Sequence, residues 1–259
     1  AIRNKQDSPI VRAMADQKAG KVHAVVSAGS TGAMVAASLI LLGRLEGVDR
    51  PAIGTIIPTV AGRLLLLDAG ANTTCTAEHL VTFARMGSVF AREMFGLENP
   101  TIGQLNIGGE AKKGTEVNVE AHGLLERSGL NFVGNVEGNQ FMLGPSDVVV
   151  TDGFTGNVVL KALEGGIGSV LDRLRALVDA DERSRTAAAP LMPALDQLFV
   201  DLDPDTYGAA LLLGVKGVSM ISHGASNAEA VCNALRTAVD MVEVDLVSAL
   251  ADAVTPAEG

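Results

Sequence analysis

Residues 147–161 constrain the fold more than any other part of the chain. They read Asp-Val-Val-Val-Thr-Asp-Gly-Phe-Thr-Gly-Asn-Val-Val-Leu-Lys, a short β-branched run followed by a turn with two glycines. Val148, Val149 and Val150 are typical of a strand buried on both faces, and apolar residues at helical spacing follow Asn157. A strand, a glycine turn and a helix leave backbone N–H groups and a positive helix end at the turn. Two interpretations remain open: an anion site, and an ordinary connection whose glycines serve packing.

Three further polar turns follow predicted strands. They lie at residues 27–33, 68–72 and 108–115, after strands at 22–27, 63–68 and 102–107. Helices are predicted at 34–42, 77–95 and 116–127. This alternation predicts an α/β fold with a largely parallel sheet and helices on both faces. Because such sheets bind ligands beyond the carboxyl ends of their strands, we expect the four polar turns to collect there.

Residues 163–206 predict a helical hairpin that projects from the domain. Apolar residues recur at helical spacing in 163–178 and again in 190–202, with a charge-rich break at 179–185. The tip at 187–193 is apolar and uncharged. We expect the hairpin to pack on a second subunit; contact with a membrane surface is the alternative.

The C-terminal part predicts a last strand at 217–222 and a last helix. Ser226 and Glu229 have the spacing of a capping box for that helix. Its expected core face carries Val231, Leu235, Val239, Val242, Leu246 and Leu250. We expect residues 1–259 to form a single α/β domain, N-terminally incomplete because the chain begins at Ala1 rather than Met.

The composition excludes several functional classes. A formal charge of −10, aromatic residues at 3% and no Trp argue against a nucleic-acid partner. The sequence has no run of membrane-spanning length and no signal peptide, which predicts a cytoplasmic protein. Cys75 and Cys232 form no metal-binding pair, so no metal site is expected. Gly109 and Gly114 have Walker-type spacing, but Thr115 stands where a P-loop needs Lys.

Seven segments in order resemble the PlsX-type phosphate acyltransferases. They are residues 27–33, 67–72, 86–91, 103–109, 131–138, 147–161 and 221–226. The resemblance implies transfer of a fatty acyl group from acyl-carrier protein to inorganic phosphate, giving acyl phosphate for phospholipid synthesis. It also implies the isocitrate dehydrogenase/phosphotransacetylase fold, a homodimer, peripheral membrane association and no cofactor.

The resemblance and the residue chemistry together indicate a candidate site. The phosphate-binding and other substrate-binding candidates are Ser27, Gly29, Ser30, Thr31, Gly32, Asp152, Gly153, Phe154, Thr155 and Gly156. Asn157 and Lys161, one helical turn later, are catalytic candidates, and Lys161 is expected to neutralise phosphate. Asn72, Asn106 and Asn135 are candidate donors to the thioester oxyanion. His223, directly after an apolar strand, is expected to position or polarise the substrate. Each also has a plain structural interpretation; for Lys161 it is a solvated helix lysine.

The chain also departs from the family. The family's opening Asp-Ala-Met-Gly-Gly-Asp strand is not matched, Ser30 replaces an Asn, and residues 207–211 lack the usual Tyr-Gly-Gly-Ala-Pro. Two other functions stay open: a phosphotransacetylase that uses coenzyme A, and a non-catalytic phosphate-binding scaffold. Lys112 and Lys113 are the expected docking group for the acidic carrier protein.

Overall fold

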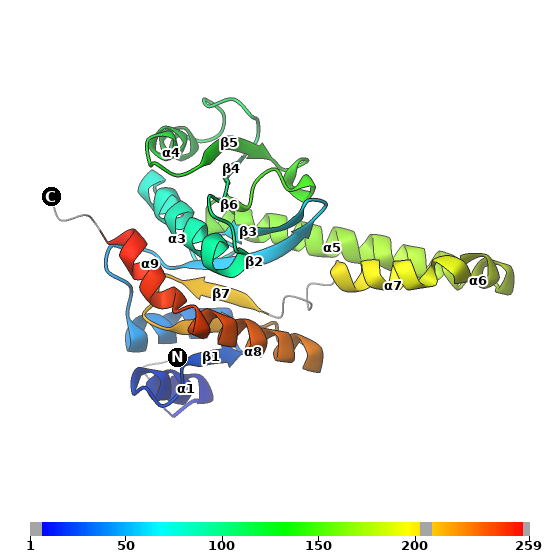
Figure 1. Cartoon of the computed structure of the whole chain (residues 1–259), viewed down its shortest axis with the longest axis horizontal. Coiled ribbons are helices and arrows are strands. Elements are labelled where there is room, and N and C mark those ends of the chain that lie inside the picture. Colours follow the sequence, from blue (N-terminus) through cyan, green and yellow to red (C-terminus); the bar gives the residue numbers. More distant parts are fainter. Residues whose placement is uncertain (1–6, 203–208, 256–259) are drawn as a thin grey trace.

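A mixed eight-stranded sheet forms the centre of the molecule, covered by helices on both faces (Figure 1). The computed structural model describes residues 7–202 and 209–255. The strands are β1 (Ala24–Ser27), β2 (Ala52–Thr59), β3 (Gly62–Leu67), β4 (Ile102–Asn106), β5 (Phe132–Glu137), β6 (Val148–Val150), β7 (Ala210–Leu213) and β8 (Val218–Ile221). The helices are α1 (Pro9–Lys18), α2 (Thr31–Ala37, continued by a π-helical turn Ser38–Leu42), α3 (Ala77–Phe95), α4 (Glu116–Glu126), α5 (Gly153–Val178), α6 (Glu182–Ala188), α7 (Met192–Asp201), α8 (Ala228–Glu243) and α9 (Leu246–Val254).

The strand order is β1-β8-β7-β2-β3-β6-β4-β5. The strands β3, β6, β4 and β5 are mutually parallel, and β1 is parallel to β8. Between these two groups, β7 and β2 pair with their neighbours in antiparallel fashion. The predicted α/β class with helices on both faces is confirmed, and the antiparallel centre is what the sequence pattern did not reveal.

The register explains how turns from oppositely directed strands reach one place. One row of paired residues crosses the sheet through Val26, Met220, Leu211, Gly54, Leu67 and Val150. The strands β1 and β8 run opposite to β3 and β6, yet all four end within one residue of this row. The polar segments that follow them therefore begin at the same level of the sheet, on either side of β2.

The core lies on both faces of the sheet. Leu64 and Leu66 of β3 pack into the cluster that includes α1 and α2, whereas Leu65 and Leu67 pack into the cluster with α3, α4, α8 and α9. All four leucines are fully buried. A strand with both faces buried needs a continuous apolar run, which explains why the sequence of β3 does not alternate.

The last helix differs from the prediction in its cap, its core face and its continuity. The N-cap is Asn227, whose Oδ1 accepts a hydrogen bond from Ala230 N at 2.8 Å; Ser226 is not the cap. The buried residues are Ala230, Ala234, Ala238 and Met241, while Val231, Leu235 and Val239 are 38–54% exposed. Small alanines let α8 lie close against β1 and β8, so the adjacent Val/Leu stripe turns outward. Leu246 and Leu250 are buried as expected, but in a separate helix, α9.

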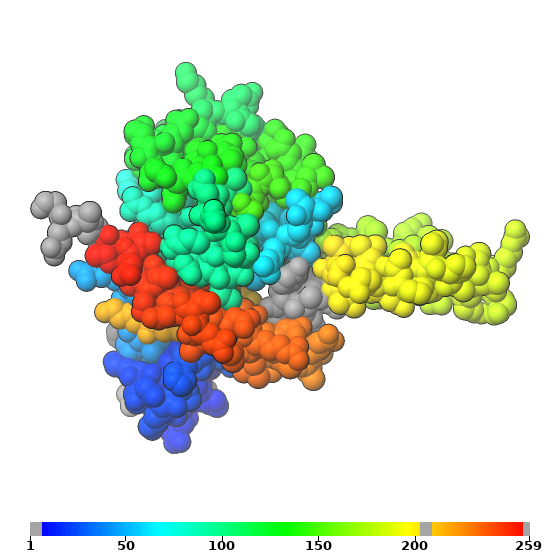
Figure 2. Space-filling view, in the orientation of Figure 1, coloured from blue at the N-terminus to red at the C-terminus, as the bar shows by residue number. Residues whose placement is uncertain are grey.

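The long helix α5 and the helices α6 and α7 project from the sheet as a hairpin (Figures 1 and 2). The predicted break at 179–185 is shorter than expected, because Asp181 caps α6 by accepting a hydrogen bond from Ser184 N at 2.7 Å. Residues 203–206 of the predicted hairpin, and Tyr207 and Gly208 of the departing motif, lie outside the described residues. In the described part of the chain, no helix has the length and apolar composition needed to cross a membrane.

Candidate functional site

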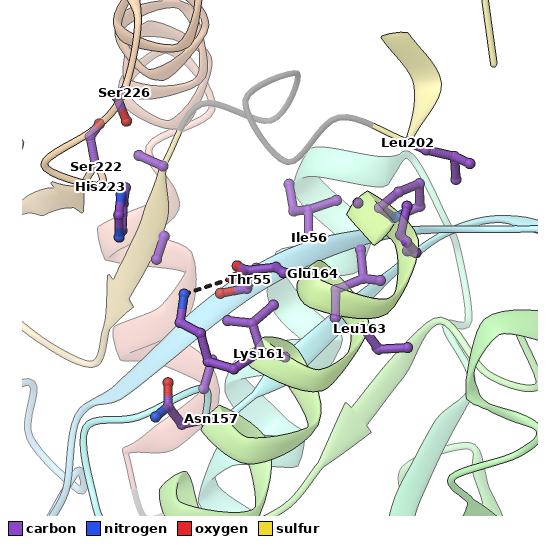
Figure 3. Close-up of a pocket in the computed structure, with 18 of the residues that line it drawn as sticks. Thr55, Ile56, Asn157, Lys161, Leu163, Glu164, Leu202, Ser222, His223 and Ser226 are labelled. Atoms are coloured by element: carbon purple, nitrogen blue, oxygen red, sulfur yellow. Dashed lines mark hydrogen bonds and ion pairs between the residues drawn. The ribbon is translucent and has the colours of Figure 1, made fainter. Parts of the chain in front are cut away.

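A cavity of about 680 Å³ lies between α5, β2 and the segments that follow β1, β3 and β8. Its polar part is lined by Thr31, Asn157, Lys161, Ser222, His223 and Ser226. Its apolar part is lined by Ile56, Leu163, Ile167, Leu171, Phe199 and Leu202. Figure 3 shows Lys161 between the two parts, with His223 on one side and Leu163 and Leu202 on the other. The volume is in the range of small-molecule sites in proteins.

Lys161 carries the positive charge of the polar part. Its Nζ donates a hydrogen bond to Glu164 Oε2 at 2.6 Å, and the two side chains are 53% and 32% exposed (Figure 3). The spacing of three residues places both on the same face of α5. Because the pair is open to solvent, an anion that enters the cavity can compete with Glu164 for the ammonium group.

His223 is held by the turn that follows β8. Its Nδ1 accepts a hydrogen bond from Ala225 N at 3.2 Å, and its carbonyl oxygen accepts one from Ser226 N at 3.0 Å. In a neutral imidazole, an accepting Nδ1 leaves the proton on Nε2. His223 can therefore donate a hydrogen bond to a ligand in the cavity without first gaining a proton.

The start of α5 favours the packing interpretation of its glycines. A Cβ on Gly156 would lie 1.9 Å from Asp68 O, and one on Gly153 would lie 2.7 Å from Asn72 O. Gly153 N donates to Asn72 O, and Thr155 N donates to Asp152 Oδ1 at 2.9 Å. Thr155 Oγ1 also donates to Asp152. These backbone donors are thus already engaged, and the glycines let α5 approach the segment after β3.

Asp68 holds the segment after β3 in place and does not itself line the cavity. The carboxylate is fully buried and accepts hydrogen bonds from the backbone N–H groups of Ile53, Gly70, Ala71 and Asn72 at 2.7–3.0 Å. The Asn72 amide donates to Asp68 and to Pro51 O. Asn72 is therefore a structural residue of the segment that supplies Ala69 and Gly70 to the cavity, and its amide is not aimed at a ligand.

The turn after β1 contributes the start of α2. Ser30 is the residue before the helix and its side chain makes no capping hydrogen bond, while Gly29 N donates to Ser27 Oγ at 3.1 Å. Thr31 lines the cavity, and Ser30 and Gly32 are its exposed neighbours. Of the predicted glycine turns, this is the one followed by a helix whose first residue lines the cavity.

The other predicted residues lie elsewhere. Asn106 Nδ2 donates to Lys113 O at 2.9 Å and Asn135 Nδ2 donates to Glu110 O at 2.8 Å, so both hold the 107–115 loop. That loop follows β4, which β3 and β6 separate from β2. The expectation that all four polar turns collect was wrong for this one. Phe154 is 64% exposed and does not line the cavity.

Some lining residues were not predicted. Glu164, Thr55 and Ser222 contribute polar atoms; the spacing of Glu164 from Lys161 was the available signal for the first. Thr55 is on β2, and only the antiparallel register brings it beside the turn after β8. Among residues 7–202 and 209–255, no group of His, Cys, Asp and Glu is arranged to hold a metal ion.

The fold is that of the phosphotransacylases. A phosphotransacetylase from Streptococcus pyogenes matches 92% of this chain and 65% of its own length with a TM-score of 0.53 and 16% identity. A branched-chain phosphotransacylase from Enterococcus faecalis matches 89% of this chain and 78% of its own length with a TM-score of 0.55 and 15% identity. At these identities, the likeness shows a shared fold alone.

Residues 1–249 match the family model described as fatty acid synthesis protein, and the chain belongs to this family. A phosphate acyltransferase from Moorella thermoacetica is 48% identical over 251 residues, which cover 97% of this chain and 74% of the relative. The phosphate acyltransferase from Desulforamulus reducens is 48% identical over 263 residues, covering 100% of this chain and 78% of the relative. The resemblance predicted from the motifs is confirmed.

Proposed function

We propose that this chain transfers an acyl group from a thioester to inorganic phosphate in the cavity between α5 and β2. The observation that supports the proposal is the combination of Lys161, Thr31 and His223 at one end of a cavity whose adjoining part is apolar. The polar end suits an anion and a polarised carbonyl, and the apolar part suits an acyl chain. Curated relatives that cover this chain almost fully are named phosphate acyltransferases.

In the proposed reaction, Lys161 Nζ exchanges Glu164 for a phosphate oxygen. The Thr31 hydroxyl and the Asn157 amide orient the anion, which raises the effective concentration of the nucleophile at the carbonyl. His223 Nε2–H donates to the carbonyl oxygen as negative charge develops there. Asp152, bound to Thr155, stays a positioning residue at the start of α5.

The bonds and protons balance without a cofactor. A phosphate oxygen forms the new bond to the acyl carbon, and the bond from that carbon to sulfur breaks. Monoprotonated phosphate loses one proton in becoming acyl phosphate, and the released thiolate takes up one. A thiol has a pKa of about 8.5, so the leaving group needs little help from a protein acid.

The proposed acyl donor is an acyl-carrier protein. Lys112 and Lys113 are exposed on the 107–115 loop, and Ile107 of the same loop is 81% exposed. Two cations and an exposed apolar side chain on one loop suit an acidic partner with an apolar contact. Asn106 and Asn135, which tie this loop to β4 and β5, would then act through the docking surface rather than at the carbonyl.

The proposed assembly is a homodimer formed through the hairpin, which acts in the cytoplasm. Val170 and Leu177 of α5 and Leu198 and Val200 of α7 are 42–66% exposed. A surface of this kind favours a protein partner. Peripheral contact of the hairpin tip with the cell membrane is the second candidate, supported by Leu191, which is 62% exposed, and by Arg183 and Arg185, which precede it in the sequence. Light scattering and vesicle flotation test the two separately.

The direct test of the function uses long-chain acyl-carrier protein and phosphate, with acetyl-coenzyme A and phosphate as the comparison. Acyl phosphate is trapped with hydroxylamine. Product from the carrier thioester alone supports the proposal, and product from acetyl-coenzyme A alone supports a phosphotransacetylase. Binding of phosphate with no product from either donor would support a non-catalytic scaffold instead.

A further inference from the structure

The apolar part of the cavity is a groove that follows one face of α5. Leu163, Ile167 and Leu171 recur every four residues, so they lie in line on the helix. Ile56 of β2 and Leu202, which follows α7, face them across the cavity (Figure 3). All are half-buried, as expected for side chains that line a groove open on one side.

Charged groups lie at the far end of this groove. The Arg175 guanidinium lies 4.4 Å from the centre of the Phe199 ring, joining α5 to α7. Arg175 Nη1 is also 3.6 Å from Asp172 Oδ1. Arg175, Asp172 and Phe199 all line the cavity. An apolar ligand that extends beyond Leu171 would have to displace this cluster or desolvate it, which is unfavourable.

We propose that this groove binds the acyl chain of the donor and that its charged end limits the length of the chain. The inference rests on the proposed function, because it places the thioester carbonyl next to the phosphate that Lys161 binds. Ten residues separate Lys161 from Leu171, a distance of about 15 Å along the helix. An extended chain advances about 1.2 Å per bond, so about twelve carbons fill the groove.

Gly168 offers a way to shorten the groove without damaging the fold. It lines the cavity, and a Cβ built on it has no heavy atom within 4 Å. It also lies in the interior of α5, where a residue with a side chain favours the helix more than glycine does. Gly166, two residues earlier, is exposed, has the same free space and does not line the cavity. Gly168→Leu and Gly166→Leu are therefore a matched pair.

The test measures the affinity of straight-chain fatty acids, from octanoic to stearic, by displacement of a fluorescent fatty acid from the full chain. For the wild type, affinity should rise about four-fold per added methylene and level off near dodecanoic acid. In Gly168→Leu, it should level off near decanoic acid, so that dodecanoic acid binds roughly fifteen-fold more weakly than to the wild type. Gly166→Leu should behave as the wild type. Thermal unfolding of both variants checks that they are folded.

Three results would overturn the inference. They are an unchanged profile in Gly168→Leu, an equal shift in both leucine variants, and affinity that does not depend on chain length. Affinity that does not depend on chain length would indicate that a partner subunit, rather than an acyl chain, covers the groove. Fatty-acid binding requires no turnover, so it separates the two proposals. A shifted profile with no acyl phosphate from any thioester would refute the proposed function and support the acyl-chain groove. Acyl-phosphate formation with an unshifted profile would support the proposed function and refute the acyl-chain groove.

Discussion

At the scale of single residues, the pair Lys161–Glu164 sets the charge of the cavity. The ammonium group is bound at 2.6 Å but half exposed, so its attraction for Glu164 is weakened by solvent. Phosphate carries more negative charge than one carboxylate and can displace it. The lysine is thus held in place when the cavity is empty of anion and remains available when an anion arrives.

Lys161→Met should raise the KM for phosphate or lower kcat by about ten-fold, the loss expected for one solvent-screened charge-assisted hydrogen bond. Glu164→Gln removes a negative charge beside the phosphate and should lower the KM instead. Lys216→Met changes an exposed lysine outside the cavity and serves as the control. Steady-state kinetics at several phosphate concentrations measure all three. Unchanged kinetics in Lys161→Met would remove this lysine from the site.

The two cysteines differ sharply in environment. Burial, with a smaller contribution from Asp68, raises the pKa of Cys75 to about 11, and its Sγ donates to Asn72 O at 3.8 Å. Cys232 is exposed on α8. Since only the thiolate reacts with alkylating reagents, about one thousandth of Cys75 is reactive at pH 8.

Iodoacetamide at that pH should therefore modify Cys232 rapidly and Cys75 far more slowly, as read by mass spectrometry of the peptides. The difference should shrink as the pH is raised toward the pKa of Cys75. Equal rates near neutral pH would show that the segment after β3 is not packed against α5.

At the scale of elements, the start of α5 depends on two glycines. Gly156 meets Asp68 O so closely that a Cβ would lie at 1.9 Å from it. Backbone cannot yield as a flexible side chain can, so a larger residue must push α5 away from β3. Because Lys161 and Asn157 lie in this first part of α5, the same shift would move them and disturb the cavity.

Gly156→Ala should lower the free energy of unfolding by about 1–3 kcal/mol. Gly165→Ala, in the same helix and with no heavy atom within 4 Å of the new Cβ, should raise it by about 0.5–1 kcal/mol. Urea denaturation followed by circular dichroism gives both values. A stable Gly156→Ala variant would argue against the close approach of α5 to Asp68.

Local sequence patterns predicted most elements but not their partners. The helix at residues 77–95 begins and ends as predicted, because Thr76 and Gly96 are clear boundary residues. The face of α8 was assigned to its larger residues, since periodicity alone does not show that alanines pack more closely against a sheet. Lys161, His223 and Thr31 were predicted site residues that the cavity brings together. Thr55 was missed because only the antiparallel pairing of β2 and β7, a contact between distant segments, places it there.

At the scale of the whole molecule, net charge and proposed partner are in conflict. The chain carries a formal charge of −10, and an acidic carrier protein would be repelled at long range. Docking then depends on a local cationic surface. Lys112 and Lys113 are exposed at the edge of the sheet that carries β4 and β5. They are therefore not part of the cavity that contains Lys161.

Lys112→Glu combined with Lys113→Glu should weaken turnover of acyl-carrier protein, most strongly at low salt, where charge acts over a longer range. Turnover of a short acyl thioester without the carrier should barely change. Kinetics with both donors at two salt concentrations measure the effect. Equal losses with both donors would show that these lysines support the fold or the chemistry rather than docking.

The most direct measurement of the central claim follows the oxygen atoms. The chain is incubated with a long-chain acyl-carrier thioester and phosphate labelled with heavy oxygen, and the products are analysed by mass spectrometry. Acyl transfer to phosphate predicts an acyl phosphate that carries the label, formed at a rate that rises with phosphate concentration and falls in Lys161→Met. Unlabelled free fatty acid, released at a rate independent of phosphate, would show that water is the acceptor and would contradict the claim.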